Sequence, residues 1–294
     1  MTARVLDGRP LAAEVRAAVT ARATAVASAL GRSPALVAIL VGDDPANLAY
    51  AEAKARAAAR CGIEFRLERL DAAEGTARVA QRVAVLGNDP GVDAILVELP
   101  LPAGYDRPAI EAAIHPARDA DGVTAVSLGH LLAGTPGPVP ATAQAALALI
   151  RHAGVALAGA DAVVIGRSVV VGKPVALLLM AAHATVTVAH SRTRDLAAVT
   201  RRAEVVVAAA GVPGLVTPEH VRPGAVVIDV GTTMVGEGEA ARLVGDVAYA
   251  AVAEVAGALT PVPGGVGPLT TALLLGNAVG LAEIRAGLVP PAPA

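Results

Sequence analysis

The stretch from Asp161 to Met180, DAVVIGRSVVVGKPVALLLM, constrains the fold of this chain more than any other. Ala162–Ile165 is a short apolar, β-branched run with the length of a buried parallel strand. Gly166 allows a sharp turn, and Gly172 and Pro174 stand where a helix would begin, because proline is tolerated in a first helical turn. The pattern predicts a strand, a glycine turn and a helix whose free N–H groups can bind a phosphate.

The glycine spacing of this turn, Gly166-x-Ser168-x-x-x-Gly172, departs from the G-x-G-x-x-G fingerprint of dinucleotide sites. Ser168 stands in place of the second glycine, and the loop is one residue longer. The spacing alone therefore fits an ordinary strand-turn-helix as well as it fits a dinucleotide site.

The next strand favours the dinucleotide interpretation. NAD sites usually carry an acidic residue at the end of this strand, which binds the ribose 2′-hydroxyl. Here the predicted strand Thr185–Ala189 is followed by His190, Ser191 and Arg192, and Arg167 lies in the glycine turn. Because guanidinium groups pair with phosphate, the residues favour NADP, with Arg167 and Arg192 near the 2′-phosphate. Solvated surface arginines are the alternative.

Composition excludes several classes of protein. The 294 residues suffice for two domains or one large one, and a net charge of −2 without a basic tract argues against nucleic acid as a partner. We expect no membrane partner, since no apolar run approaches the length of a bilayer span. The single cysteine, Cys61, and an N-terminus without an apolar signal region predict a cytoplasmic protein. The tail Pro290–Ala294 is expected to be disordered.

The chain alternates strands and helices, which predicts an α/β fold with a parallel sheet covered on both faces. In the first half, strands are expected over 35–41, 63–70 and 94–98, and helices over 10–30, 46–60, 76–86 and 107–114. A segment rich in proline and glycine, 134–140, marks the domain boundary. Beyond it we expect further strands over 205–208 and 225–229, and helices over 142–152 and 269–284.

Lysine is rare in this chain, and its positions are informative. Only Lys54 and Lys173 occur among 24 basic residues, and lysine, unlike arginine, can release its proton. Tyr50 and Lys54 lie four residues apart on a predicted helix, near the sheet edge where α/β proteins bind ligands. Glu98 closes the third strand at that edge. The plainer alternative is an exposed, snorkelling Tyr–Lys pair.

Other polar residues give weaker signals. Asp121 follows the third strand and could join Lys54 and Glu98, but Asp119 and Asp121 could equally cap their own loop. The histidines show no metal-ligand spacing, so we expect no metal site. Pro261–Pro268 holds three prolines and three glycines in eight residues, which predicts a rigid loop that lines a ligand site.

Together these stretches closely resemble the bifunctional methylenetetrahydrofolate dehydrogenase/methenyltetrahydrofolate cyclohydrolase family. The matching segments cover nearly the whole chain: 41–46 with Tyr50 and Lys54, 96–102, 119–122, 166–174, 227–231, 244–247 and 260–268. The segment TPVPGGVGP at 260–268 is the most specific of them.

The resemblance implies a two-domain α/β protein, typically a homodimer. Residues 1–139 and 269–294 would form the catalytic, folate-binding domain, and 140–268 a Rossmann-like NADP-binding domain, with folate in the cleft between them. Such proteins oxidise 5,10-methylenetetrahydrofolate to the methenyl form and hydrolyse it to 10-formyltetrahydrofolate.

By the same resemblance, Lys54 would be the general acid and base of hydrolysis, and Tyr50 would stack on the aminobenzoyl ring. Asp121 would hold the pterin, and Glu98 would stand beside Lys54. The remaining folate contacts would come from Leu99, Pro100, Pro263, Gly264 and Gly265. The cofactor would contact Gly166, Arg167, Ser168, Gly172, Lys173, Pro174, Ser191, Arg192 and Thr232.

The chain also departs from the family. Glutamine is usual where this chain has Glu98, and a carboxylate there favours the charged form of Lys54, a poor base. Thr232 and Thr233 replace an isoleucine–asparagine pair near the nicotinamide. A dehydrogenase with weakened hydrolysis or an altered substrate, and a non-catalytic dinucleotide-binding protein, are therefore the alternatives.

Overall fold

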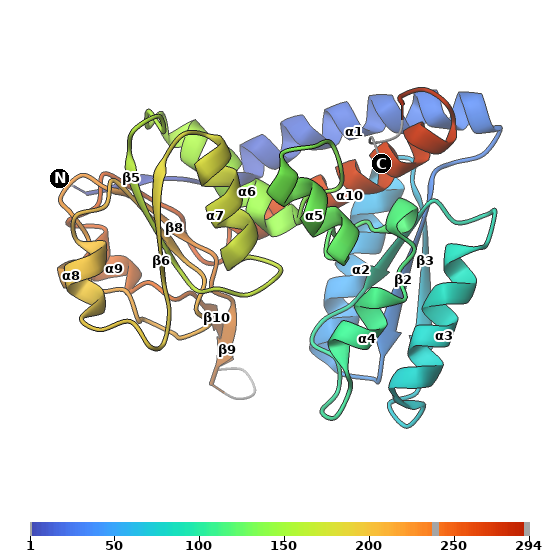
Figure 1. Cartoon of the computed structure of the whole chain (residues 1–294), viewed down its shortest axis with the longest axis horizontal. Helices are drawn as coiled ribbons and strands as arrows, with labels where there is room; N and C mark the ends of the chain where they lie inside the picture. Colours follow the sequence, from blue (N-terminus) through green and yellow to red (C-terminus); the bar gives the residue numbers. More distant parts are fainter. Residues whose placement is uncertain (1, 237–240, 291–294) are drawn as a thin grey trace. The chain divides into compact units, whose positions relative to one another are not determined.

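The computed structural model describes residues 2–236 and 241–290 (Figure 1). The chain forms two compact units, one of residues 1–12 and 140–270 and the other of residues 13–139 and 271–294. Residues 1–12 thus group with the later part of the chain, not with residues 13–139 as expected. The reason is that β1 (Arg4–Val5) pairs with β11 (Ala258–Leu259) in the sheet of the first unit. The predicted disordered tail falls largely on residues 291–294, outside the described residues.

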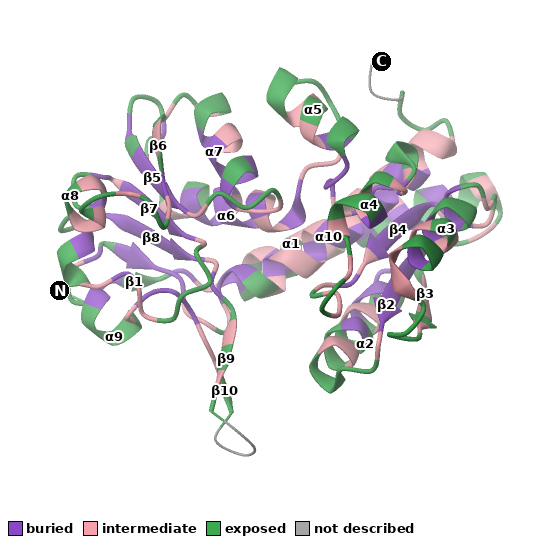
Figure 2. Cartoon of the chain, turned by 60° about the horizontal axis from the view of Figure 1, so that its bottom comes forward, coloured by how far each residue is buried: buried purple, intermediate pink, exposed green. Residues whose placement is uncertain are grey.

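The first unit is built on a six-stranded parallel sheet of order β1-β11-β8-β7-β5-β6. Its other strands are β5 (Asp161–Ile165), β6 (Thr185–Ala189), β7 (Val205–Ala208) and β8 (Val226–Asp229). The strand order reverses between β5 and β7, and ligands of open α/β sheets bind at such a switch point, beyond the carboxyl ends of the strands. The apolar runs of β7 and β8 are buried at every position, as Figure 2 shows.

Helices lie on both faces of this sheet (Figure 1). α6 (Ala141–Ala153) and α7 (Gly172–Ala181) cover one face, and the short α8 (Leu196–Thr200) and α9 (Tyr249–Val252) lie on the other. A small antiparallel hairpin of β9 (Thr233–Val235) and β10 (Arg242–Val244) stands apart from the sheet. The predicted α/β class with parallel sheets is confirmed.

The second unit holds a three-stranded parallel sheet of order β3-β2-β4. The strands are β2 (Ala35–Val41), β3 (Glu64–Leu70) and β4 (Ala94–Val97), and β2 is buried throughout. α2 (Pro45–Arg60) begins at Asp44, whose carboxylate accepts hydrogen bonds from the first free N–H groups of the helix. α3 (Gly75–Gly87) lies on the opposite side of the sheet (Figures 1 and 2).

The rest of the second unit is helical. α4 (Arg107–Ala112), a 3₁₀ turn (Pro116–Arg118) and α5 (Ala125–Ala133) follow β4. α1 (Gly8–Leu30) and α10 (Val266–Arg285) each have residues in both units.

α10 corrects the expectation that no apolar run reaches the length of a bilayer span. Among the described residues it is the one helix long and apolar enough to cross a membrane. Its polar contacts are nevertheless those of a core helix: Asn277 donates to the carbonyls of Ala120 and Val139, and Glu283 pairs with Arg22.

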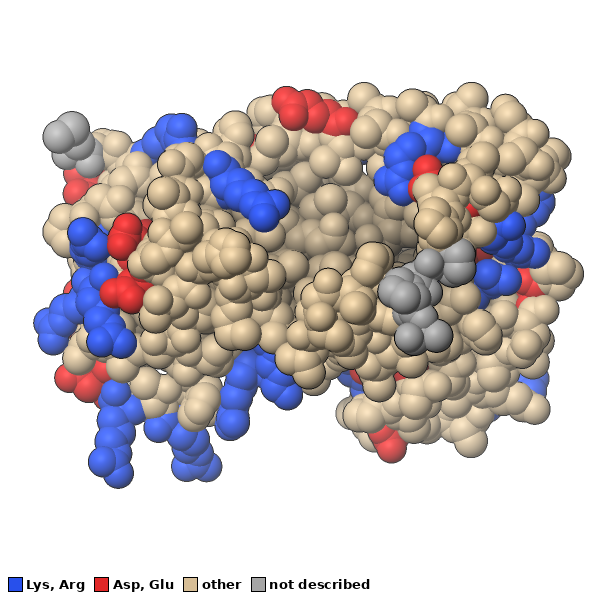
Figure 3. All heavy atoms as spheres, turned by 45° about the horizontal axis from the view of Figure 1, so that its top comes forward, with Lys and Arg blue, Asp and Glu red and all other residues tan. Residues whose placement is uncertain are grey.

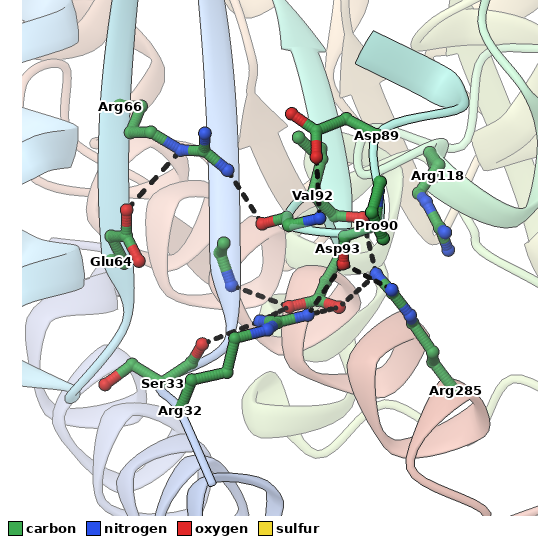
Figure 4. A network of polar contacts seen from close by, with 12 residues as sticks. Arg32, Ser33, Glu64, Arg66, Asp89, Pro90, Val92, Asp93, Arg118 and Arg285 are labelled. Carbon is green, nitrogen blue, oxygen red and sulfur yellow. Dashed lines mark hydrogen bonds and ion pairs between the residues drawn. The ribbon is translucent and has the colours of Figure 1, made fainter. Parts of the chain in front are cut away.

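A buried aspartate closes the amino edge of the three-stranded sheet (Figure 4). Asp93 lies directly before β4 and is fully buried. Its carboxylate accepts hydrogen bonds from Arg32 Nη1 at 2.6 Å, Arg285 Nη1 at 3.1 Å and the backbone N–H of Ala35 at 2.8 Å. One carboxylate thereby joins the segment after α1, the start of β2 and the end of α10.

Charged side chains are mixed on the face drawn in Figure 3. Lys and Arg stand there in separate groups, with Asp and Glu among them and broad uncharged areas between. On that face the basic residues form no continuous stripe of the kind that tracks a nucleic-acid backbone.

Candidate active site

Lys54 and Glu98 form an ion pair at the carboxyl edge of the three-stranded sheet. Glu98 directly follows β4, and Lys54 lies on α2. Lys54 Nζ is 2.5 Å from Glu98 Oε2, and the side chains are 21 % and 5 % exposed. The interpretation of Lys54 as a snorkelling surface residue is therefore wrong, because its ammonium group meets a buried carboxylate.

The second oxygen of this carboxylate is chemically unusual. Glu98 Oε1 is buried, and no described residue provides it with a hydrogen-bond partner. Since an unpaired buried carboxylate oxygen is costly, Glu98 Oε1 is an acceptor available to a ligand at this edge.

Tyr50 lies on the same helix, one turn before Lys54, and is 52 % exposed. Leu99 and Pro100, joined by a cis peptide bond, continue the chain beyond Glu98. The Asn47 side chain of α2 donates to the Pro100 carbonyl at 3.3 Å, which ties this segment to the helix. The exposed phenol ring of Tyr50 therefore belongs to a residue one helical turn from Lys54.

A cavity of about 460 Å³ opens where β2 and β3 end. Its lining residues are the last two of β3 and those directly after the two strands: Gly42, Asp43, Arg69, Leu70, Asp71 and Ala72. The carboxyl edge of this sheet therefore carries a cavity as well as the Lys54–Glu98 ion pair.

Asp119 and Asp121 have different roles in the loop after β4. Asp119 is fully buried and accepts hydrogen bonds from the backbone N–H groups of Val123 and Thr124 and from the Ser127 hydroxyl. Its predicted role as a loop cap is confirmed. Asp121 is partly buried, and charged side chains near it act on its carboxyl group.

Removal from water and the nearby charge of Asp119 raise the pKa of Asp121 to about 7. Lys54 and Arg107 oppose this rise in pKa, whereas Glu98 adds to it. These side chains are therefore close enough for their charges to interact, and Lys54, Glu98 and Asp121 all belong to the second unit; their convergence on one cleft stays a prediction.

The glycine turn of the first unit joins β5 to α7, as predicted. Gly166 has a φ of +124°, and a Cβ atom there would lie 2.1 Å from the Ala209 carbonyl oxygen at the end of β7. A Cβ at Gly172 would lie 2.2 Å from the carbonyl oxygen of Gly166. Ser168 Oγ accepts hydrogen bonds from the N–H groups of Val171 and Gly172, both at 3.3 Å. The turn therefore requires both glycines, and Ser168 organises it from within.

The other predicted cofactor residues lie beyond the carboxyl ends of the same sheet. Arg167 and Lys173 are exposed beside the glycine turn, and Pro174 is buried in the first turn of α7. Ser191 and Arg192 are exposed after β6, and Thr232 is exposed after β8. Parallel strands bring all these positions to one edge, which includes the switch point.

Sequence reasoning assigned no role to two buried carboxylates at this edge. Asp229 ends β8 and accepts hydrogen bonds from the backbone N–H groups of Gly231, Asp246 and Val247. Asp246 Oδ2 accepts from those of Ala210 and Gly211. Burial raises the pKa of Asp229 to about 6, although the N–H groups oppose the rise. The pair holds together the loops that follow β7, β8 and β10.

The predicted loop Pro261–Pro268 ends earlier than expected, because Val266–Pro268 already form the first turn of α10. It belongs to the first unit, whereas Tyr50 and Lys54 belong to the second. The Gly8 N–H donates to the Gly264 carbonyl at 3.0 Å, and a Cβ at Gly8 would lie 1.9 Å from the Gly265 carbonyl oxygen. Pro263 beside them is exposed and follows a cis peptide bond. The loop packs closely on the start of α1.

No candidate metal site occurs in residues 2–236 and 241–290. In these residues no group of three or more His, Cys, Asp or Glu side chains is arranged to hold an ion.

Two protein-family models match the chain in succession. The catalytic domain of tetrahydrofolate dehydrogenase/cyclohydrolase matches residues 6–121, and the NAD(P)-binding domain of the same enzymes matches residues 140–286. The chain belongs to the tetrahydrofolate dehydrogenase/cyclohydrolase family. The two matches assign Lys54 and Glu98 to the catalytic domain of this family and the glycine turn to its NAD(P)-binding domain.

Relatives within the family match the chain from end to end. The bifunctional protein FolD of Synechococcus sp. strain RCC307 is 50 % identical over 296 residues, which cover 100 % of this chain and 99 % of that protein. FolD of Trypanosoma brucei, solved with NADP cofactor and inhibitor, has a TM-score of 0.91 at 38 % identity, covering 97 % of this chain and 99 % of that one. FolD of Campylobacter jejuni has a TM-score of 0.90 at 36 % identity, covering 96 % and 99 %.

Proposed function

We propose that this protein oxidises 5,10-methylenetetrahydrofolate with NADP and hydrolyses the resulting 5,10-methenyltetrahydrofolate to 10-formyltetrahydrofolate. The observation that carries the proposal is the Lys54–Glu98 pair beside Asp121 in the part of the chain that matches the family's catalytic domain. Full-length identity of 50 % to a bifunctional relative supports it.

The glycine turn is tightly folded, because a Cβ at Gly166 or Gly172 would collide with backbone carbonyl groups of the chain itself, and it lies in the part of the chain that matches the NAD(P)-binding domain. Arg167 and Arg192 are exposed at the same edge, where they can bind the 2′-phosphate of NADP. When bound, the cofactor supplies a nicotinamide that accepts hydride. The residues of the first unit then orient that ring, since hydride transfer depends mainly on alignment.

In the second unit, Tyr50 would stack on the aminobenzoyl ring and Asp121 would hold the pterin N–H groups. Lys54 would serve as the acid–base group of hydrolysis. In that step water adds to the bridging carbon and gives up one proton. The bond from this carbon to N5 then breaks as the new hydroxyl becomes the formyl C=O, and the hydroxyl proton passes to N5. The unprotonated amine of Lys54 is the form that can accept the proton of water.

A dehydrogenase with weakened hydrolysis is the second candidate, and one distance favours it. A carboxylate oxygen lies 2.5 Å from Lys54 Nζ, so this nitrogen is engaged in an ion pair and is not free to take the proton of a water molecule. Glu98→Gln removes that charge and keeps the shape. If the second candidate is right, this variant hydrolyses the methenyl form faster than the wild type. No gain would contradict it.

The primary test follows NADPH and methenyltetrahydrofolate separately from 5,10-methylenetetrahydrofolate and NADP. NADPH without accumulation of the methenyl form supports both activities, and NADPH with accumulation supports the dehydrogenase alone. No NADPH would refute the proposal in favour of another substrate or a non-catalytic dinucleotide-binding protein. Substitution of NAD for NADP tests the cofactor. The homodimer and the cytoplasmic location stay predictions.

A further inference from the structure

The oxidation proposed above changes the charge of the folate. As hydride, a hydrogen nucleus with two electrons, leaves the bridging carbon for NADP⁺, the N5–C–N10 unit becomes an amidinium cation and NADP⁺ becomes NADPH. The bridge of the methylene form is neutral. Negative charge near this bridge therefore stabilises the transition state and the oxidised folate more than the substrate.

Acidic groups outnumber basic groups around Asp121. The charged side chains of this cluster are Lys54, Arg107, Glu98, Glu111, Asp119 and Asp121. Lys54 pairs with Glu98, and Arg107 Nε lies 2.6 Å from the Glu111 carboxylate. Asp119 takes its hydrogen bonds from neutral N–H and O–H groups. The two ion pairs cancel, which leaves the charge of Asp119 in excess, together with that of Asp121 at pH values above its raised pKa of about 7.

Glu98 places negative charge closest to Lys54. Its Oε2 is engaged by Lys54, while its Oε1 is buried without a described partner. A glutamine, usual at this position in the family that the sequence resembles, would present a neutral amide there. The charge of Glu98 balances the charge of Lys54, so the remaining acidic charge of the site is not neutralised by the lysine. With a neutral amide at position 98, the lysine would instead offset part of that acidic charge.

We propose that Glu98 makes this site selective for the cationic, oxidised form of the folate, so that methenyltetrahydrofolate is held more tightly than neutral tetrahydrofolates. The inference rests on the proposed function. A cation stabilised in this way beside a charged lysine is also a poorer target for water, which agrees in direction with weakened hydrolysis.

The test compares methenyltetrahydrofolate, which is cationic at the bridge, with tetrahydrofolate, which lacks the bridge and its charge. Both carry the same ring and glutamate, so the ratio of their inhibition constants isolates the bridge. The constants come from initial rates of NADPH formation in the wild type, Glu98→Gln, Glu98→Asp and Glu52→Gln. Glu52 is the matched control, because it is an exposed acid on α2 paired with Arg56.

We expect methenyltetrahydrofolate to inhibit the wild type more strongly than tetrahydrofolate, and Glu98→Gln to reduce this preference about tenfold. Glu98→Asp keeps the charge and should keep the preference, and Glu52→Gln should not change it. If Glu98→Gln does not fold, Asp121→Asn tests the same excess charge and should also reduce the preference.

Equal weakening of both inhibitors by Glu98→Gln would show a merely structural role and overturn the inference, as would an unchanged ratio. Failure of the proposed function looks different, because the wild type would then form no NADPH from 5,10-methylenetetrahydrofolate.

Discussion

Replacement of Asp93 by asparagine tests whether the buried carboxylate in Figure 4 holds the second unit together. Asp93 accepts hydrogen bonds from Arg32 Nη1 and Nη2, Arg285 Nη1 and the Ala35 N–H. An asparagine oxygen can accept two of the four and places an NH₂ group against the other donors. Two lost bonds to charged groups, at about 1.5–3 kcal/mol each, give an expected loss of about 3–6 kcal/mol in the free energy of unfolding.

The dependence on pH gives a second readout. Desolvation alone would raise the pKa of Asp93, but the hydrogen bonds from Arg32 and Ala35 outweigh it and lower that pKa below 3.8. A lowered pKa in the folded state means that the stabilisation is present above pH 3.8 and is lost as the pH falls through the folded-state value. The difference between wild type and Asp93→Asn should therefore shrink in that acidic range.

The assay is urea unfolding followed by circular dichroism at neutral pH. Glu64→Gln is the control, because Glu64 is 52 % exposed and 3.5 Å from Arg66, and it should cost under about 1 kcal/mol. If Asp93→Asn costs no more than this control, the network contributes little to stability and the reasoning fails.

Three further predictions concern the two sites. Lys54→Met should slow hydrolysis of methenyltetrahydrofolate about 100-fold, measured without nicotinamide, while NADPH formation persists; equal loss of both activities would contradict a specific role. Gly172→Ala should raise the KM for NADP about tenfold or more, because its Cβ would lie 2.2 Å from the Gly166 carbonyl oxygen; methenyl hydrolysis should be unaffected, and an unchanged KM would refute the close approach. The pKa of Asp121, about 7, predicts that kcat/KM for the folate rises from pH 6 to 8, because the carboxylate that binds pterin N–H groups forms in this range. Asp121→Asn should remove this dependence on pH. A wild-type kcat/KM that does not change between pH 6 and 8 would exclude such a role.

The long periodic elements could be predicted from sequence because their apolar patterns are local. The strand over 35–41 and the turn into the helix at Gly172 match the structure closely. β1 and β11 were missed because two residues each carry no periodicity, and only their pairing defines them. The helix over Ala125–Ala133 was missed because it is only nine residues long and contains Gly129, although Thr124 is a good N-cap.

The residues of the candidate site could be predicted where they follow parallel strands, because the carboxyl ends of such strands lie at one edge of the sheet. Glu98 and Lys54 were expected at one edge, and the edge holds both. The pairing of Asp229 and Asp246 was not predictable, because each binds backbone N–H groups of loops distant in sequence. Nothing in the local sequence distinguishes such a carboxylate from a turn residue.

The interleaved division of the chain has a consequence for its synthesis. A growing polypeptide usually completes its N-terminal domain first. Here one compact unit needs residues up to 270 and the other needs α10, whose Arg285 reaches Asp93. One unit can therefore be complete on the ribosome only after residue 270 has been added and the other only after Arg285, and a chain released earlier would expose apolar faces of both sheets.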